Sequence, residues 1–177
     1  YRYHGKFQSP GFQCGMGTVI MSACFDEFLK MDLSKIDVDA CVAAWPTLEQ
    51  EQQRALEIFK DFPVPQLGYT EITKKYNDAE TVRQQLTKVK ENWTELKERI
   101  QNQVYTYDKM VALMKSVGAP VGPESIGLTR AQVRRMVDSV QLMRWRINLF
   151  DLCKRAQIYD ALLDRVFGKG GVLEISE

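Results

Sequence analysis

The sequence predicts an all-α protein, a bundle-like domain of many helices, on three observations. Apolar residues recur at spacings of three and four along most of the chain, which is the pattern of helices that bury one face. Residues that favour helix starts, such as Ser9, Thr47 and Asp78, stand just before these periodic stretches. No stretch of useful length alternates polar and apolar residues, as a half-buried strand would, and no internal repeat is visible.

The first predicted helix begins after Ser9 and extends to about Met31. The hydroxyl of Ser9 can accept a hydrogen bond from a free N–H of the first turn, and Pro10 suits the first helical position because its missing N–H is not needed there. One face of this helix carries small side chains, namely Gly11, Gly15, Thr18 and Ser22. Because each helical glycine costs roughly 1 kcal/mol relative to alanine, something must approach this face closely. The two candidates are a tightly packed neighbouring helix and a ligand or metal at the helix N-terminus, where free N–H groups favour anions.

Shorter helices are predicted next. One follows Asp37, and a capping box of Thr47 and Gln50 opens another, which the prolines at 63 and 65 end. Residues 68–76 are ambiguous, with one or two helical turns as the expectation.

The longest polar helix is predicted from Ala79 to about Asn102, with Asp78 as its N-cap. Its apolar positions form a single stripe, which consists of Val82, Leu86, Val89, Trp93, Leu96 and Ile100. Charged residues occupy the other faces, which is typical of a solvated outer helix. A coiled-coil partner surface is the alternative, although the run is short for one.

The last third of the chain continues the helical pattern. A helix is predicted to begin near Asp108 and to end at Gly118, and Thr129 with Gln132 forms a second capping box. Residues 168–177 follow a glycine-rich stop and are predicted to be a tail. The final helices carry apolar residues at helical spacing, namely Val133, Met136, Val137, Val140, Leu142, Met143, Ile147, Phe150, Ile158, Leu162, Leu163 and Phe167.

Composition limits the classes of function. A chain of 177 residues fits one domain with a real core. Lys and Arg number 24 against 23 Asp and Glu, a balance that argues against a nucleic-acid binder. The four cysteines include no Cys-x-x-Cys pair and sit among apolar neighbours, which predicts buried free thiols and a reducing, cytoplasmic compartment. No apolar run approaches the roughly 18 residues that a membrane span needs, and no signal peptide is visible.

Three segments, in order along the chain, carry a resemblance to a known family. Residues 9–18 read Ser-Pro-Gly-Phe-Gln-Cys-Gly-Met-Gly-Thr, and residues 143–152 read Met-Arg-Trp-Arg-Ile-Asn-Leu-Phe-Asp-Leu. Between them, residues 113–120 end in Gly-Ala-Pro, and residues 126–128 read Ile-Gly-Leu. These segments are similar to Ser-His-Gly-Phe-Lys-Val-Gly-Ile-Gly-Thr, to Ile-Arg-Asp-Arg-Tyr-Thr-Val-Leu-Asp-Leu and to the Gly-Ala-Pro turn before Ile-Gly-Ile of the sn-glycerol-1-phosphate dehydrogenases. That family belongs to the metal-dependent polyol dehydrogenases and dehydroquinate synthases.

The resemblance implies that residues 1–177 form the second, helical domain of a two-domain, dehydroquinate synthase-like fold, on the metal and substrate side. The family binds one divalent metal, usually zinc, between its domains, and the metal polarises the hydroxyl of a polyol phosphate so that hydride can pass to NAD(P). The nucleotide-binding domain and two metal ligands, an Asp and a His, lie upstream in the family and are absent from this sequence. We therefore expect this chain alone to bind neither metal nor NAD(P) and to be inactive.

Two positions depart from the family motif. Pro10 stands where the family has the histidine that binds the metal, and Gln13 stands where it has lysine. Proline has no donor atom, so the aligned position cannot coordinate zinc. This departure keeps a second hypothesis open, in which the chain is a catalytically degenerate relative that acts as a binding or scaffolding protein.

Few other residues are candidates for chemistry. His4 is the only histidine, and it has no partner at metal-ligand spacing, so a solvated loop residue competes with a metal ligand as its interpretation. Arg144 and Arg146 lie among apolar residues and are expected to be partly buried, with Arg144 and Asn148 on one helix face. Structural ion pairing is one interpretation, and binding of a substrate phosphate is the other. No Ser/His/Asp triad or phosphate-loop signature is present, and the oligomeric state stays open, a homo-oligomer included.

Overall fold

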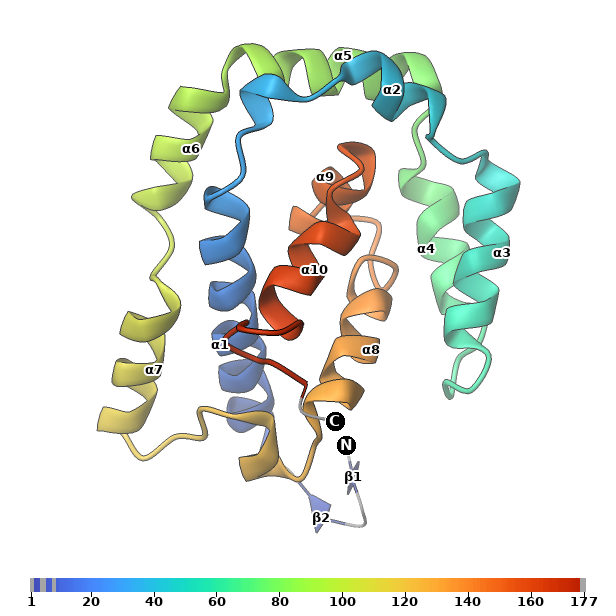
Figure 1. Ribbon diagram of the computed structural model, residues 1–177. Coiled ribbons are helices and arrows are strands. Elements are labelled where there is room, and N and C mark those ends of the chain that lie inside the picture. The colour runs from blue at the N-terminus through green and yellow to red at the C-terminus, as the bar shows by residue number, and fades with distance from the viewer. Residues whose placement is uncertain (1, 4–5, 8, 176–177) are drawn as a thin grey trace. The chain divides into compact units, whose positions relative to one another are not determined.

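The computed structural model describes residues 2–3, 6–7 and 9–175, and most of it is helical (Figure 1). Within these residues the only strands are Arg2–Tyr3 (β1) and Lys6–Phe7 (β2), which pair antiparallel. The all-α prediction is confirmed at this level. The helices are α1 (Pro10–Leu29), η1 (Leu33–Lys35), α2 (Val38–Ala43), α3 (Leu48–Phe59), α4 (Leu67–Lys75), α5 (Ala79–Glu91), α6 (Trp93–Gln101), α7 (Tyr107–Ser116), η2 (Pro123–Ile126), α8 (Arg130–Val140), α9 (Leu149–Arg155) and α10 (Tyr159–Phe167).

The chain divides into two compact units, each of which is discontinuous in sequence. Unit 1 consists of Tyr1–Met31, Glu95–Arg134 and Ala161–Glu177, and unit 2 consists of Asp32–Thr94 and Arg135–Asp160.

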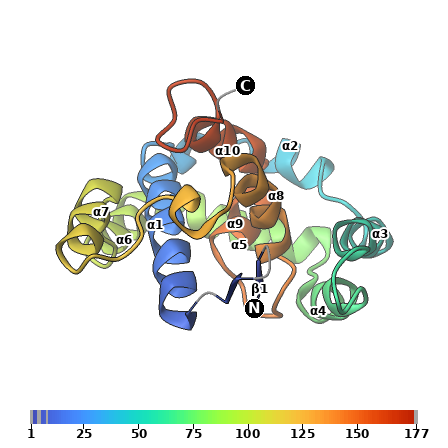
Figure 2. The same cartoon turned by 90° about the horizontal axis from the view of Figure 1, so that it is seen from below.

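In unit 1, α1 packs along α7, as Figure 2 shows. Ser9 is the N-cap of α1, because its Oγ accepts the Phe12 N–H at 3.2 Å. At Gly15 a Cβ would lie 3.3 Å from the methyl group of Met114 in α7, so close packing of a neighbouring helix accounts for this glycine. Elsewhere on the small-residue stripe, Gly11 and Thr18 are exposed.

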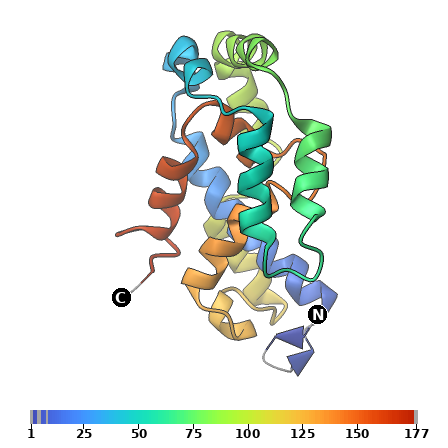
Figure 3. The ribbon, with the colours of Figure 1, turned by 90° about the vertical axis from the view of Figure 1, so that its right-hand side faces the viewer.

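In unit 2, α3 and α4 lie side by side and are joined by a short loop (Figures 1 and 3). The capping box of Thr47 and Gln50 is present at the start of α3. These two helices enclose one part of the core, which consists of Ala55, Phe59, Ile72 and Leu142. A second part lies where α2 packs against α5 and consists of Cys41, Val82, Leu86 and Ala156.

Two glycines should respond in opposite ways to a methyl group. In Gly68→Ala the new Cβ would lie 2.7 Å from Cδ2 of Phe59, so we expect overpacking to lower the free energy of unfolding by about 1–3 kcal/mol. Gly17 has no neighbour within 4 Å of such a Cβ, so Gly17→Ala should raise the free energy of unfolding by roughly 0.5–1 kcal/mol through the better helix propensity of alanine. Urea unfolding of both variants checks the pair, and a stable Gly68→Ala protein would contradict the close approach of α3 and α4.

The predicted helix over 79–102 is wrong as a single element, because the chain breaks at Asn92 between α5 and α6. Asn92 has φ −110° and ψ 16°, and its side-chain Nδ2 donates to the Lys88 carbonyl at 2.8 Å. Asparagine side chains compete in this way with the helical backbone. The predicted cap at Asp78 is confirmed, since Asp78 accepts the Thr81 N–H at 2.8 Å.

Other local predictions have mixed outcomes. The ambiguous segment 68–76 lies mostly within a regular helix, α4. The expected capping box of Thr129 and Gln132 is present, and Gly118 follows α7 with a left-handed φ of 66°. Within the predicted tail 168–177, Leu173 is buried and its N–H donates to the Val166 carbonyl at 3.0 Å.

Among the described residues, no helix combines the length and apolar character that crossing a membrane requires.

Candidate functional site

Unit 2 contains a buried ion pair at the junction of two helices. Lys75 is the last residue of α4, and Asp151 lies in the first turn of α9. The Lys75 Nζ lies 2.8 Å from Oδ1 and 3.1 Å from Oδ2 of Asp151, and their side chains are only 2% and 4% exposed. Taking two charges out of water is costly unless further hydrogen bonds satisfy both groups. Those further bonds come from the segment that connects α8 to α9.

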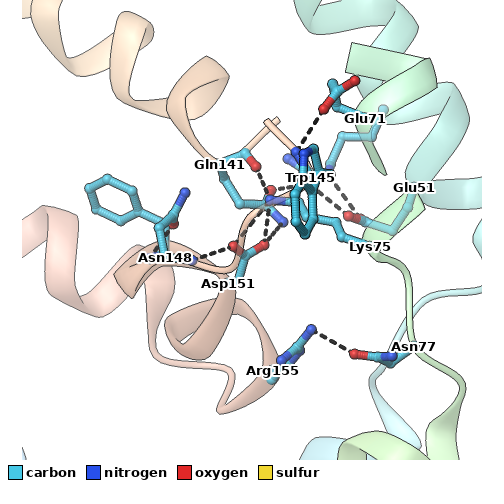
Figure 4. A network of polar contacts seen from close by, with 11 residues as sticks. Glu51, Glu71, Lys75, Asn77, Gln141, Trp145, Asn148, Asp151 and Arg155 are labelled. Atoms are coloured by element: carbon cyan, nitrogen blue, oxygen red, sulfur yellow. Dashed lines mark hydrogen bonds and ion pairs between the residues drawn. The ribbon is translucent and has the colours of Figure 1, made fainter. Parts of the chain in front are cut away.

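This connection is fastened to the ion pair at both ends (Figure 4). At its start, the Gln141 carbonyl accepts from Lys75 Nζ, and Gln141 Nε2 donates to Asp151 Oδ1 at 3.0 Å. At its end, the Asn148 N–H donates to Asp151 Oδ2 at 2.8 Å, while Asn148 Oδ1 accepts the Phe150 N–H at 2.9 Å. Asn148 and Asp151 thus form a capping box at the start of α9. The Asp151 carboxylate therefore hydrogen-bonds to both ends of the segment that connects α8 to α9.

A second ion pair extends the network into α3. Arg54 donates to Glu51 through Nε at 2.9 Å and Nη2 at 2.7 Å, and Glu51 is buried. The same Nη2 donates to Gln141 Oε1 at 2.5 Å. The buried side chain of Gln141 thus has a partner for both its oxygen and its nitrogen.

Between the two fastened ends lie residues 143–147, which we call the basic loop. All five residues are exposed, with Met143 at 44% and Trp145 and Ile147 at 57%. The Arg146 guanidinium carbon lies 5.8 Å from the centroid of the Trp145 ring, which is within cation–π range. Among the described residues, neither Arg144 nor Arg146 forms an ion pair within 4.0 Å. The loop therefore presents two guanidinium groups to its surroundings.

The middle of the basic loop has its own anchor in α4. The backbone N–H of Trp145 donates to Glu71 Oε2 at 2.7 Å, and Glu71 Oε1 accepts from Lys74 Nζ at 2.6 Å. The Lys74 hydrogen bond, the Trp145 N–H and the charges of Lys74 and Arg144 together lower the pKa of Glu71, although partial burial opposes them. Glu71 is therefore held ionised beside the loop.

The structure corrects the expectations for the two arginines. The segment 142–147 is a turn and loop, so Arg144 and Asn148 do not share a helix face, and both arginines are exposed rather than partly buried. The reason is that α8 ends at Val140 and the next helix begins only at Leu149, after the capping box of Asn148 and Asp151, so the residues between them carry no helical register. Binding of a substrate phosphate by Arg144 and Arg146 stays a prediction.

A local sequence signal exists for Asp151 but not for Lys75 or Gln141. Asp151 stands three residues after Asn148, which is the spacing of a capping box. Lys75 ends a polar, amphipathic segment, where a lysine is usually solvated. Its burial depends on contacts with Gln141 and Asp151, which lie 66 and 76 positions further along the sequence, so no local signal could have revealed it.

A third buried cation, Arg155, lies near the same junction in α9. Its Nη2 donates to Asn77 Oδ1 at 2.9 Å, and Asn77 Oδ1 also accepts from Gln85 Nε2 at 3.4 Å. Burial lowers the pKa of Arg155, and the charge of Asp151 partly offsets this. Within the described part of the chain, Arg155 Nε and Gln85 Oε1 are buried without a hydrogen-bond partner.

The predicted metal positions gain no support from neighbours. His4 lies outside the described residues. Pro10 is exposed at the first position of α1, where it follows the N-cap Ser9. Among the described residues, no three His, Cys, Asp or Glu side chains come together in a group that could hold a metal.

The cysteines are all free, but the prediction that they are buried is wrong for Cys14. Cys14 lies on the exposed side of α1, whereas Cys24, Cys41 and Cys153 are buried. Burial raises the pKa of Cys24 to about 12, although the charge of Arg134 partly opposes the shift. At pH 8 its reactive thiolate is therefore suppressed.

Alkylation should distinguish these thiols. We expect iodoacetamide at pH 8 to modify Cys14 of the folded protein within minutes and to leave Cys24 and Cys153 unmodified, because both are buried and the raised pKa keeps the Cys24 thiol protonated. Peptide mass spectrometry with and without urea provides the measurement. Equal modification of all four cysteines without urea would contradict the burial of Cys24 and Cys153.

Comparisons with family models, with curated protein sequences and with solved structures find no match for this chain.

Proposed function

We propose that this chain is the helical, substrate-side domain of a metal-dependent, NAD(P)-linked polyol-phosphate dehydrogenase similar to the sn-glycerol-1-phosphate dehydrogenases. The proposal includes the expectation that the domain is inactive without its nucleotide-binding partner domain. Its cellular place would be the cytoplasm.

One observation supports the proposal most directly. The last of the three family-like segments shares Arg144, Arg146 and Asp151 with the family motif. Asp151 closes the loop that carries the two arginines, since it accepts from Gln141 at one end and from Asn148 at the other. The residues shared with the family thus belong to one structural unit, in which a buried carboxylate fixes the ends of the loop that carries the two exposed arginines. Planar guanidinium groups suit the oxygens of a phosphate monoester.

The metal half of the proposal fits the described residues poorly. Pro10 has no donor atom, and no group of three ligands is present among the described residues. The role assigned to this chain is therefore limited to binding and orienting the phosphate of the substrate through Arg144 and Arg146. No catalytic step is assigned to its residues.

A catalytically degenerate relative that serves as a binding or scaffolding protein is the second candidate, and Pro10 favours it. Pro10 occupies the first position of α1 without disturbing the Ser9 cap, so a metal ligand is lost while the helix is kept.

Assays of the whole protein encoded by the reading frame, beside the 177-residue chain, would separate the two candidates. The proposal expects the whole protein to oxidise sn-glycerol 1-phosphate with NAD(P)⁺ in a zinc-dependent way, and the chain alone to show no turnover. Turnover by the chain alone would contradict the division of roles. A folded whole protein that binds neither zinc nor NAD(P)⁺ would favour the scaffold.

The variant Pro10→His tests the aligned ligand position in that whole protein. Restoring a ligand should raise zinc affinity by more than the about 10–100-fold typical of changes outside the coordination sphere, as measured by competition with a chelator. The exposed N1 position should accept histidine without loss of the fold. Equal zinc affinities would show that the alignment at Pro10 is wrong.

A further inference from the structure

The basic loop is held more firmly than an exposed connection requires. Residues 143–147 are all exposed, yet the loop is fastened to Asp151 and Lys75 at both ends and to Glu71 in the middle. Burying the Lys75–Asp151 pair carries a desolvation cost, and a hydrophobic pair of similar volume would often be at least as stable. An exposed loop that is fixed by buried charges has its backbone preorganised, and this lowers the cost of ordering the loop on binding.

The groups that the loop presents have a definite chemistry. The two guanidinium groups belong to Arg144 and Arg146, which are separated by one residue in the sequence. Arg146 lies over the Trp145 ring, which restricts its orientation. Neither forms an ion pair with a carboxylate among the described residues, so both can donate to an incoming anion. Phosphate accepts the parallel N–H donors of arginine in bidentate geometry.

We propose that the basic loop is a preorganised site for a soluble phosphate monoester and that Glu71 is a positioning residue for it. Glu71 acts through the Trp145 N–H, which fixes the middle of the loop between the two arginines. The identity of the ligand as a polyol phosphate rests on the proposed function. The site itself rests on the geometry of the loop.

Two opposing effects of Glu71 make its role testable. Its carboxylate anchors the Trp145 N–H, which favours phosphate binding, but its negative charge lies close enough to Arg144 to interact with it, which disfavours an anion. Glu71→Gln keeps an acceptor for the N–H and removes the charge. Glu71→Ala removes both the acceptor and the charge. A positioning role therefore predicts that glutamine preserves or improves phosphate affinity, whereas alanine weakens it.

The first experiment measures binding of sn-glycerol 1-phosphate to the 177-residue chain by calorimetry and by the NMR shifts of the arginine Nε–H groups. We expect Arg144→Ala and Arg146→Ala each to weaken binding by about tenfold or more, as for loss of a charge-assisted hydrogen bond. The exposed Arg99→Ala in α6 is the matched control and should have no effect. Unchanged affinity in both loop variants, or no binding by the natural chain, would overturn the site.

The second experiment compares Glu71→Ala with Glu71→Gln. We expect about tenfold weaker binding in the alanine variant and no loss in the glutamine variant. Glu57→Ala is the matched control, because Glu57 forms the same i,i+3 pair, with Lys60, at 2.5 Å. Equal affinities of the alanine and glutamine variants would overturn the positioning role, whatever their stability.

Two further ligands identify the source of the phosphate. Vesicles of phosphatidylglycerol test a lipid surface, and binding to vesicles but not to sn-glycerol 1-phosphate would overturn the proposal of a soluble ligand. Methyl phosphate tests the dependence on the polyol. Equal binding of methyl phosphate and sn-glycerol 1-phosphate would uphold the phosphate site and count against the polyol-phosphate dehydrogenase.

Discussion

Asp151→Ala is expected to lower the free energy of unfolding by about 3–5 kcal/mol, because it leaves the buried ammonium of Lys75 without its counter-charge. The same change removes the acceptor for Gln141 Nε2 and for the Asn148 N–H, so the start of α9 loses part of its cap. Urea unfolding followed by circular dichroism measures the loss. Removing a single partner of a buried pair typically has a larger effect than the pair contributes as a whole.

Two companion variants make this result specific. Asp39→Ala removes an exposed carboxylate that pairs with Arg83, and the unfolding midpoint should not change. The double variant Lys75→Met with Asp151→Leu removes both charges and should be more stable than Asp151→Ala. If Asp151→Ala unfolds at the natural urea concentration, the carboxylate does not hold the connection between α8 and α9.

Phe59→Ala is expected to lower the free energy of unfolding by a similar amount, about 3–5 kcal/mol, for a different reason. Phe59 is fully buried at the end of α3, and its ring lies against Gly68 of α4 and 4.6 Å from the Phe62 ring. Truncation would leave a cavity between two helices that pack against each other. Phe62→Ala, at a ring that is 39% exposed, should lower the free energy of unfolding by only about 1 kcal/mol.

The contact between Phe59 and Gly68 adds a test by coupling. Phe59→Leu shortens the side chain that a methyl group at residue 68 would meet, so Phe59→Leu with Gly68→Ala should lose less stability than the sum of the single losses. Strict additivity, within about 0.5 kcal/mol, would show that the two residues are not in contact.

The helix starts could be predicted from the sequence because their signals are local. Ser9, Thr47 and Asp78 each accept the backbone N–H three residues further on, as their side chains and positions predicted. Helix ends without glycine or proline were harder to predict. The apolar stripe continues through Asn92, so periodicity alone joined α5 to α6.

Only part of the candidate site could be predicted from the sequence, because only part of it depends on local signals. Arg144, Arg146 and Asp151 could be singled out from their own segment. The features that organise them, the burial of Lys75 and the anchor at Glu71, come from α4 and depend on long-range packing. Alternating apolar and basic residues at 143–147 also suggested a buried helix, whereas α8 ends at Val140 and α9 begins at Leu149, so these residues lie in an exposed loop.

The single carboxylate that closes the basic loop constrains how this protein can change in evolution. Lys75, Gln141 and Asp151 come from three separate segments, yet each completes the hydrogen bonding of the others. A substitution at Lys75 or Asp151 passes through an intermediate with an uncompensated buried charge, which selection for folding would remove. Relatives of this chain should therefore either keep the three residues together or replace them as a set.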